Sequence, residues 1–239
     1  MAMDSIQIEP MKVAFIPIRS GSKGIKNKNM KDLGGKPLVQ WVVDTVLATQ
    51  LFDEVWIATD STSYRHRLLS HYGSSINVFL RSEESATDKS NVGHVVSDFL
   101  NFRHLSAKDL FVLFQATSPF ISSEDVMRVI QVMTQPVIDG ALACHRLKRF
   151  RWSDNGVSLD YAIGDKPMRQ DYKGFLVECG AFYAARIGSL ITRHNNQYAF
   201  TLSGNIVPIE VDRLTAIDID DPYDWTLAES FIPFTYNRL

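Results

Sequence analysis

A loop of small residues and cations near the start of the chain has the composition of a phosphate-binding site. Its small residues let the backbone turn tightly and present its N–H groups; they are Ser20, Gly21, Ser22 and Gly24. Its cations place positive charge around that turn; they are Arg19, Lys23, Lys26 and Lys28. The preceding run, Lys12–Ile18, is short, β-branched and almost entirely apolar, which predicts a strand buried on both faces. Together they predict a place to hold the phosphates of a nucleotide.

The spacing of this loop matches neither standard phosphate motif. It is not GxxxxGK[ST] and it is not GxGxxG, so neither of those mechanisms applies. Basic runs also occur on solvated surfaces and in patches that bind nucleic acid. The loop by itself leaves these interpretations open.

Two carboxylates near the end of the chain suggest a divalent-cation site. Asp218 and Asp220 stand two residues apart in Ala216–Asp220, which predicts a strand with both side chains on one face. Mg²⁺ is typically held by one or two carboxylates together with phosphate oxygens and water. The alternative is a polar strand end that faces solvent before a helix that Asp221 caps and Pro222 begins.

Other polar residues are candidates for contacts with a ligand, and each also fits an ordinary structural role. Gln115 follows a buried strand and offers a donor and an acceptor to a base or sugar, or to the backbone of its own loop. Arg81 and Ser90 bracket a polar loop that also fits an ordinary surface. Arg169 suits a bidentate contact with phosphate or carboxylate, or an exposed hairpin. The same irregular segment carries Lys166 and Gln170.

The elements that must position these residues alternate between strand and helix. The patterns predict strands at Lys12–Ile18, Glu54–Asp60, Asn77–Leu80, Asp109–Phe114 and Gly140–Cys144. They predict helices from Pro37, over Ser61–Tyr72 and Asn91–Phe102, and from a cap at Ser122 or Ser123 to about Met133. This order predicts an α/β fold with a mainly parallel sheet flanked by helices and a crevice at the strands' carboxyl ends. Arg19, Asp60 and Gln115 each fall at or just after such an end.

The pattern loosens after Arg146. The run RFRWS, two glycine turns and Pro167 indicate an excursion from the sheet, which we assign to an inserted arm over about 149–203. Strand patterns return at Gly180–Ala185 and Ile206–Val211, and the last helix runs to about Phe231. We therefore expect one domain over 11–232 and a flexible extension over 1–10.

Composition excludes several classes of protein. The 239 residues carry a net charge of -2, which provides no global field toward nucleic acid or anionic membrane. Two cysteines, Cys144 and Cys179, form no CxxC pair, which favours a reducing compartment without a disulfide framework. Without an apolar run of about 18 residues or a signal-peptide core, we expect a cytoplasmic protein.

Several segments in the right order resemble the CMP-sialic acid synthetases, the N-acylneuraminate cytidylyltransferases. The opening motif of that family, AR-x-x-SKG-x-x-x-KN after a strand, corresponds here to IRSGSKGIKNKN. The runs QATSP, RFRWS, RQDYKG, GAFY and DID resemble further family motifs between Lys12 and Glu229. The resemblance implies a Rossmann-like nucleotidyltransferase domain whose dimerisation arm completes the site of a partner in a homodimer or a dimer of dimers.

The resemblance also implies roles for individual residues. Residues that would bind the CTP co-substrate are Arg19, Ser20, Gly21, Ser22, Asn29, Arg81, Ser90 and Gln115. Residues that would contact the sugar are Gln115, Gln170, Cys179 and Tyr183. Arg169, Lys166 and Lys23 would serve the reacting centre, and Asp218 and Asp220 would bind Mg²⁺ or Mn²⁺.

The implied reaction transfers CMP from CTP to the C2 hydroxyl of N-acylneuraminate and releases pyrophosphate. The sequence departs from bacterial members at Cys179, Val177, Ile121 and Val92. Because Val177 and Cys179 fall where the family meets its acidic sugar, pseudaminic, legionaminic or 3-deoxy-manno-octulosonic acid stays open as the substrate. A non-catalytic nucleotide-binding homologue is a further alternative. We expect no nucleic-acid or membrane partner.

Overall fold

The computed structural model describes residues 9–22, 24–82, 84–86, 90–194 and 197–235. Its strands are β1 (Lys12–Pro17), β2 (Asp32–Leu33), β3 (Lys36–Pro37), β4 (Glu54–Thr59), β5 (Asn77–Leu80), β6 (Leu110–Phe114), β7 (Gly140–Leu147), β8 (Phe175–Arg186), β9 (Leu190–His194), β10 (Gln197–Leu202) and β11 (Ile206–Val211). Its α-helices are α1 (Leu38–Thr49), α2 (Thr62–Tyr72), α3 (Val92–Arg103), α4 (Ser123–Met133) and α5 (Pro222–Thr235). Short 3₁₀ turns are η1 (Lys28–Met30), η2 (Gly73–Ser75), η3 (Glu84–Ala86) and η4 (Ile187–Ser189).

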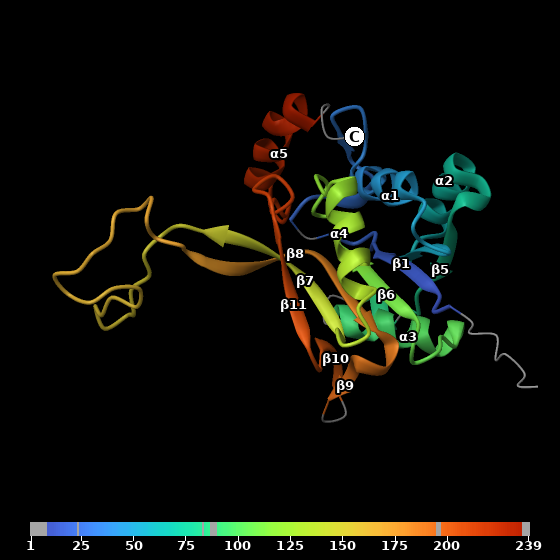
Figure 1. Ribbon diagram of the computed structural model, residues 1–239. Coiled ribbons are helices and arrows are strands. Elements are labelled where there is room, and N and C mark those ends of the chain that lie inside the picture. Colours follow the sequence, from blue (N-terminus) through green and yellow to red (C-terminus); the bar gives the residue numbers. More distant parts are fainter. Residues whose placement is uncertain (1–8, 23, 83, 87–89, 195–196, 236–239) are drawn as a thin grey trace, which may run out of the picture.

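A seven-stranded sheet in the order β11-β7-β8-β6-β1-β4-β5 forms the centre of the molecule (Figure 1). Neighbouring strands run parallel except around β8, which is antiparallel to both β6 and β7. The chain leaves β1 toward β4 and β5 on one side and returns as β6 on the other. This reversal is the switch point at which doubly wound folds bind ligands, and it confirms the predicted α/β class.

Helices cover both faces of the sheet because successive strand residues point to opposite sides. On β1, Ala14 and Ile16 pack in a core with α1, α2 and α4, whereas Val13 and Phe15 pack in a core with α3. Phe15 lies 4.7 Å from Phe99 of α3 between ring centroids. The β9–β10 hairpin lies beside α3 on that second face (Figure 1). The predicted helices begin within about a residue of the observed ones, several at a capping residue such as Ser122.

Two boundaries differ from the sequence prediction. Residues 217–220 form no strand: Ile219 donates a backbone hydrogen bond to the Thr117 carbonyl at 2.9 Å, and no ladder follows. The excursion from the sheet is shorter than 149–203, because residues from Phe175 to Arg186 return as β8. The remaining arm projects far from the sheet (Figure 1, yellow to gold). Most of the predicted extension over 1–10 lies outside the described residues.

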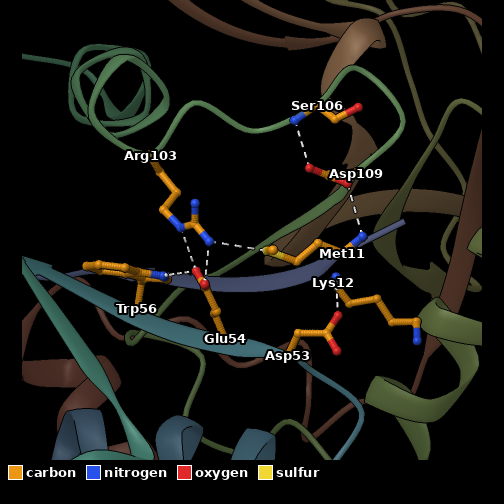
Figure 2. A network of polar contacts seen from close by, with 8 residues as sticks. All are labelled: Met11, Lys12, Asp53, Glu54, Trp56, Arg103, Ser106 and Asp109. Carbon is orange, nitrogen blue, oxygen red and sulfur yellow. Dashed lines mark hydrogen bonds and ion pairs between the residues drawn. The ribbon is translucent and has the colours of Figure 1, made fainter. Parts of the chain in front are cut away.

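Polar contacts fix the amino ends of the central strands, at the edge away from the switch point (Figure 2). Arg103, at the end of α3, donates to Glu54 Oε1 at 2.5 Å and Oε2 at 2.9 Å. Trp56 Nε1 donates to the same carboxylate at 2.7 Å. Asp109 accepts from the backbone of Met11 at 3.0 Å, which ties β1 to the start of β6. These contacts therefore fix the strands at one end, and the opposite ends of the same strands carry the candidate site residues.

Among the helices of the described residues, none combines the length and apolar character needed to cross a membrane.

Candidate active site

A cavity of about 460 Å³ opens at the carboxyl ends of the central strands. The first loop contributes Arg19, Ser22, Gly24, Lys28 and Asn29 to its lining. Segments after β5 and β6 and the start of α3 contribute Arg81, Ser90, Asn91, Val92, Gln115 and Thr117. Asp218 and Asp220 enter from the segment before α5. The structure thus brings together sequence-predicted residues that are some two hundred positions apart.

The loop after β1 is anchored to the end of β4. Asp60 accepts from the backbone N–H of Ser20 and from its hydroxyl, both at 2.8 Å. Asn29, which is buried, donates its side-chain amide to the Arg19 carbonyl at 2.9 Å. Asn29 therefore braces the loop from beneath while Arg19 lines the cavity. Ser20 and Gly21 lie in the loop but outside the cavity lining.

The loop also contacts the aspartate segment directly. A Cβ placed on Gly24 would lie 2.6 Å from the Asp220 carbonyl oxygen, a distance that excludes any side chain there. Lys28 Nζ donates to the Ile219 carbonyl at 2.5 Å and lies 3.3 Å from Asp220 Oδ1. The Lys28 side chain is 12% exposed, so this cation is held in place inside the cavity.

The two carboxylates line the cavity from either side of a buried residue. Ile219, between them, is fully buried, so alternation places Asp218 and Asp220 toward the cavity although no strand forms. Burial raises the pKa of Asp218 above its ordinary value; a hydrogen bond from Thr117 opposes this, and the charge of Asp220 adds to it. The Asp220 side chain is 78% exposed. Both side chains are open to solvent, and among the described residues Lys28 is the cation whose charge opposes the shift at Asp218.

This pair fits a hard divalent cation that also takes phosphate oxygens. Within the described residues no group of three or more His, Cys, Asp or Glu side chains could hold a metal. A dedicated protein cage is therefore absent from that part of the chain. Mg²⁺ bound together with a substrate requires only one or two carboxylates, which matches Asp218 and Asp220.

Arg81 contributes a partly buried cation on the other side of the cavity. Burial lowers the pKa of Arg81, and the charge of Asp60 opposes that shift. One guanidinium nitrogen donates to the Ser85 carbonyl, whereas its buried Nε has no partner among the described residues. Arg81 therefore keeps donor capacity beside the cavity.

The predicted sugar residues on β8 lie next to the cavity rather than in its lining. Burial raises the pKa of both Cys179 and Tyr183, and the charge of Asp218 contributes to each shift. The pairing of β7 with β8 shifts register between Leu142 and Cys144, opposite Cys179 and the left-handed Gly180. Such bulges redirect side chains near binding sites.

The predicted residues of the arm do not reach the cavity of their own chain. The arm has an aromatic cluster in which Phe150 lies 5.1 Å from Tyr161 and 4.8 Å from Tyr172. Lys166 Nζ lies 5.1 Å from the Phe150 ring, within this cluster. Arg169 and Gln170 are exposed on the projecting arm. Lys23, the remaining predicted catalytic residue, lies outside the described residues.

Sequence reasoning missed several residues that the structure places in the cavity. Lys28 was counted only among the loop's cations, although its place in the KN pair of the opening motif was the available signal. Thr117 stands in the QATSP run, which was the available signal, and Asn91 was predicted only as the start of a helix.

A second, mainly apolar groove of about 830 Å³ lies between residues 213–217 and α5 and shares Asp218 with the first cavity. Phe231 and Phe234 line it. Its few polar groups cannot balance several phosphates, so the first cavity is the candidate for an anionic ligand.

The fold and this cavity define an α/β protein with a cation-lined cavity at the switch point of its sheet. The chain belongs to the cytidylyltransferase family, whose model matches residues 13–139. It is 31% identical to N-acylneuraminate cytidylyltransferase B of Danio rerio, over 91% of this chain and 50% of the relative. It is 35% identical to the N-acylneuraminate cytidylyltransferase of Escherichia coli, over 90% of this chain and 51% of the relative.

The relatives differ in how much of their length the chain covers. The chain spans about half the length of the zebrafish and E. coli relatives. It covers 98% of the CMP-N,N'-diacetyllegionaminic acid synthase of Legionella pneumophila at 30% identity, over 95% of this chain. A solved CMP:2-keto-3-deoxy-manno-octonic acid synthetase, complexed with CTP, has a TM-score of 0.67 at 20% identity, over 94% of this chain and 99% of its own. That similarity establishes the fold.

Proposed function

We propose that the protein transfers CMP from CTP to the C2 hydroxyl of N-acylneuraminate, with release of pyrophosphate. One observation carries the proposal: the loop after β1 and the segment of Asp218 and Asp220 line a single cavity and touch through Gly24 and Lys28. To bind a triphosphate, a site needs positive side chains and backbone N–H donors on one side and a pair of carboxylates that hold a divalent ion on the other. The cavity provides both.

The loop and Arg81 would bind the nucleotide. Arg19 and Lys28 place positive charge in the cavity, and the brace from Asn29 fixes the loop before substrate arrives. Charge builds on the phosphates when the sugar hydroxyl attacks the α-phosphate, so fixed cations lower the barrier without reorganising. Gln115, at the end of β6, would contact the base or the sugar.

Asp218 and Asp220 would hold Mg²⁺ or Mn²⁺. When bound, such an ion neutralises phosphate charge and lowers the pKa of a nearby hydroxyl. Lys28 stays against Asp220 and the Ile219 carbonyl and keeps the pair oriented toward the phosphates.

A second copy of the chain would supply the arm residues. Arg169, Lys166 and Gln170 lie on an arm that projects from the molecule, so they can act in the cavity of a partner. The arm has a fixed shape: Arg151 donates to Asp160 at 2.8 Å and holds the pKa of Asp160 at about 2. A homodimer or dimer of dimers would then complete each site.

A related acidic keto sugar is the second candidate substrate. The legionaminic acid synthase is matched over nearly its whole length, unlike the zebrafish and E. coli relatives. Val177 and Cys179 stand where the bacterial motif has an arginine and an asparagine. These positions favour a different sugar specificity on the same CTP chemistry.

The test is pyrophosphate release from CTP and Mg²⁺ with a panel of N-acetylneuraminic, legionaminic, pseudaminic and 3-deoxy-manno-octulosonic acids. We expect release only when an acidic sugar is present and fastest with N-acetylneuraminic acid, and we expect chelation of the divalent ion to abolish it. Fastest release with another sugar would establish the second candidate. Nucleotide binding without release for any sugar would favour a non-catalytic homologue.

A further inference from the structure

The start of α3, which lines the cavity, packs directly against the backbone of β10. Ser90, Asn91 and Val92 line the cavity at this point. One residue further, a Cβ on Gly93 would lie 2.0 Å from the Ala199 carbonyl oxygen and 2.2 Å from its carbon. Glycine weakens a helix, so its presence in the first turn matches a close backbone approach that no other residue allows.

Two further contacts hold the same turn to the hairpin. Asn91 Nδ2 donates to the Tyr198 carbonyl at 2.6 Å, while its Oδ1 accepts from the His94 N–H at 3.2 Å as the helix cap. The His94 ring stacks on the Tyr198 ring, with centroids 3.7 Å apart and planes 10° apart. The β9–β10 hairpin thus fixes both the position and the orientation of the first turn of α3.

The same helix links the hairpin to the segment that carries Arg81. His94 Nε2 lies 3.8 Å from Asp98 Oδ1, and Asp98 Oδ2 accepts from the Ser82 hydroxyl at 2.8 Å. Ser82 is the chain neighbour of Arg81, which lines the cavity. A shift of α3 would therefore move two parts of the lining together.

We propose that Gly93 and Tyr198 are positioning residues for the nucleotide: through them the β9–β10 hairpin sets the start of α3 and the Arg81 segment against the cavity. The proposal rests on the proposed function, because it takes CTP as the ligand. Neither residue lines the cavity. Their effect should be larger on the affinity for CTP than on the KM for the sugar, because Gly93 and Tyr198 act on the start of α3, whereas the sugar-side candidates Cys179 and Tyr183 lie on β8.

The experiment measures CTP affinity by isothermal titration calorimetry, and the KM of each substrate by pyrophosphate release, for the full-length chain. We expect Gly93→Ala to weaken CTP binding about tenfold or more, because an added methyl must displace the helix. Tyr198→Leu removes the stacked ring and should weaken CTP binding about threefold, whereas Tyr198→Phe keeps the ring and should stay within about twofold of wild type. The KM for the sugar should change less than about twofold in every variant.

Gly188→Ala is the matched control. Its Cβ would lie 3.2 Å from the Ala107 carbonyl oxygen, beside the start of β9 and away from the cavity. Thermal unfolding shows which variants are folded; if Gly93→Ala is not, Tyr198→Leu and Tyr198→Phe decide. Unchanged CTP affinity in the folded variants, or equal changes in the KM of both substrates, overturns the positioning role. A wild-type protein that binds no CTP contradicts the proposed function itself, which separates the two failures.

Discussion

At the scale of single residues, Lys28 connects the two halves of the candidate site. It comes from the loop after β1 but contacts the carbonyl of Ile219 and the carboxylate of Asp220. A lysine ammonium in a partly desolvated cavity interacts more strongly with phosphate than one in water does. Lys28 is therefore the cation whose loss should matter most among those the structure describes in the loop.

Replacing Lys28 with methionine keeps the length of the side chain and removes its charge. We expect kcat for pyrophosphate release to fall about 10²–10³-fold, the usual cost of losing one fixed donor to developing negative charge. Lys26→Met is the matched control, since Lys26 belongs to the same loop but is exposed and does not line the cavity. Equal rates in the two variants would contradict the role of Lys28.

At the scale of elements, an ion pair at the amino edge of the sheet makes a pH-dependent contribution to stability. The hydrogen bonds from Arg103 hold the pKa of Glu54 below its ordinary value, against the opposing effect of burial. The folded state therefore favours the ionised form of Glu54 over the protonated form. Its contribution to stability is present above the unfolded pKa of about 4.3 and is lost as the pH falls through the lower folded pKa.

Glu54→Gln should lower the free energy of unfolding by about 1–2 kcal/mol at pH 7, because it leaves Arg103 with a neutral partner. The difference from wild type should shrink as the pH falls below about 4. Urea denaturation at pH 7 and at pH 3.5 measures both effects. Glu124→Gln, in the exposed pair with Arg128 on α4, serves as the control and should cost less than about 0.5 kcal/mol. A difference for Glu54→Gln that stays constant with pH would contradict this account.

At the scale of the whole molecule, the arm raises the question of how many chains build one site. Its predicted residues are remote from the cavity of their own chain, and its exposed apolar side chains include Ile163, which is 99% exposed, and Met168, which is 64% exposed. Exposed apolar side chains of this kind are typical of surfaces that meet another protein. An arm used in exchange should therefore allow two defective chains to repair each other.

Coexpression of Arg169→Ala with Asp220→Ala tests this exchange. Each variant alone should be inactive, whereas a mixed dimer would contain one intact site, which gives about a quarter of wild-type activity after random pairing. Asp218→Asn with Asp220→Ala is the control pair, because both defects fall in the same half-site and no mixture restores it. If the first pair stays as inactive as the control, the arm does not complete a partner's cavity.

Much of this architecture could be predicted from local sequence patterns. The apolar runs of β1, β4 and β6 and the capping residues Asn91 and Ser122 located their elements to within about a residue. The prediction at 216–220 identified the correct orientation of Asp218 and Asp220 with the wrong element, because an extended segment alternates its side chains whether or not it pairs. The arm was predicted within about 149–203, and the excursion from the sheet ends where β8 begins at Phe175.

The sequence by itself determined the class of fold, the composition of the loop after β1 and the presence of a carboxylate pair. These depend on the periodicity of apolar residues and on the small menu of residues that turn a chain or bind a cation. Only the tertiary structure decided that Lys28 contacts the aspartate segment, that Gly24 admits no side chain beside Asp220, and that Gly93 lies against β10. Contacts between positions about a hundred or more residues apart follow from the packing of the sheet and leave no local pattern for the sequence to display.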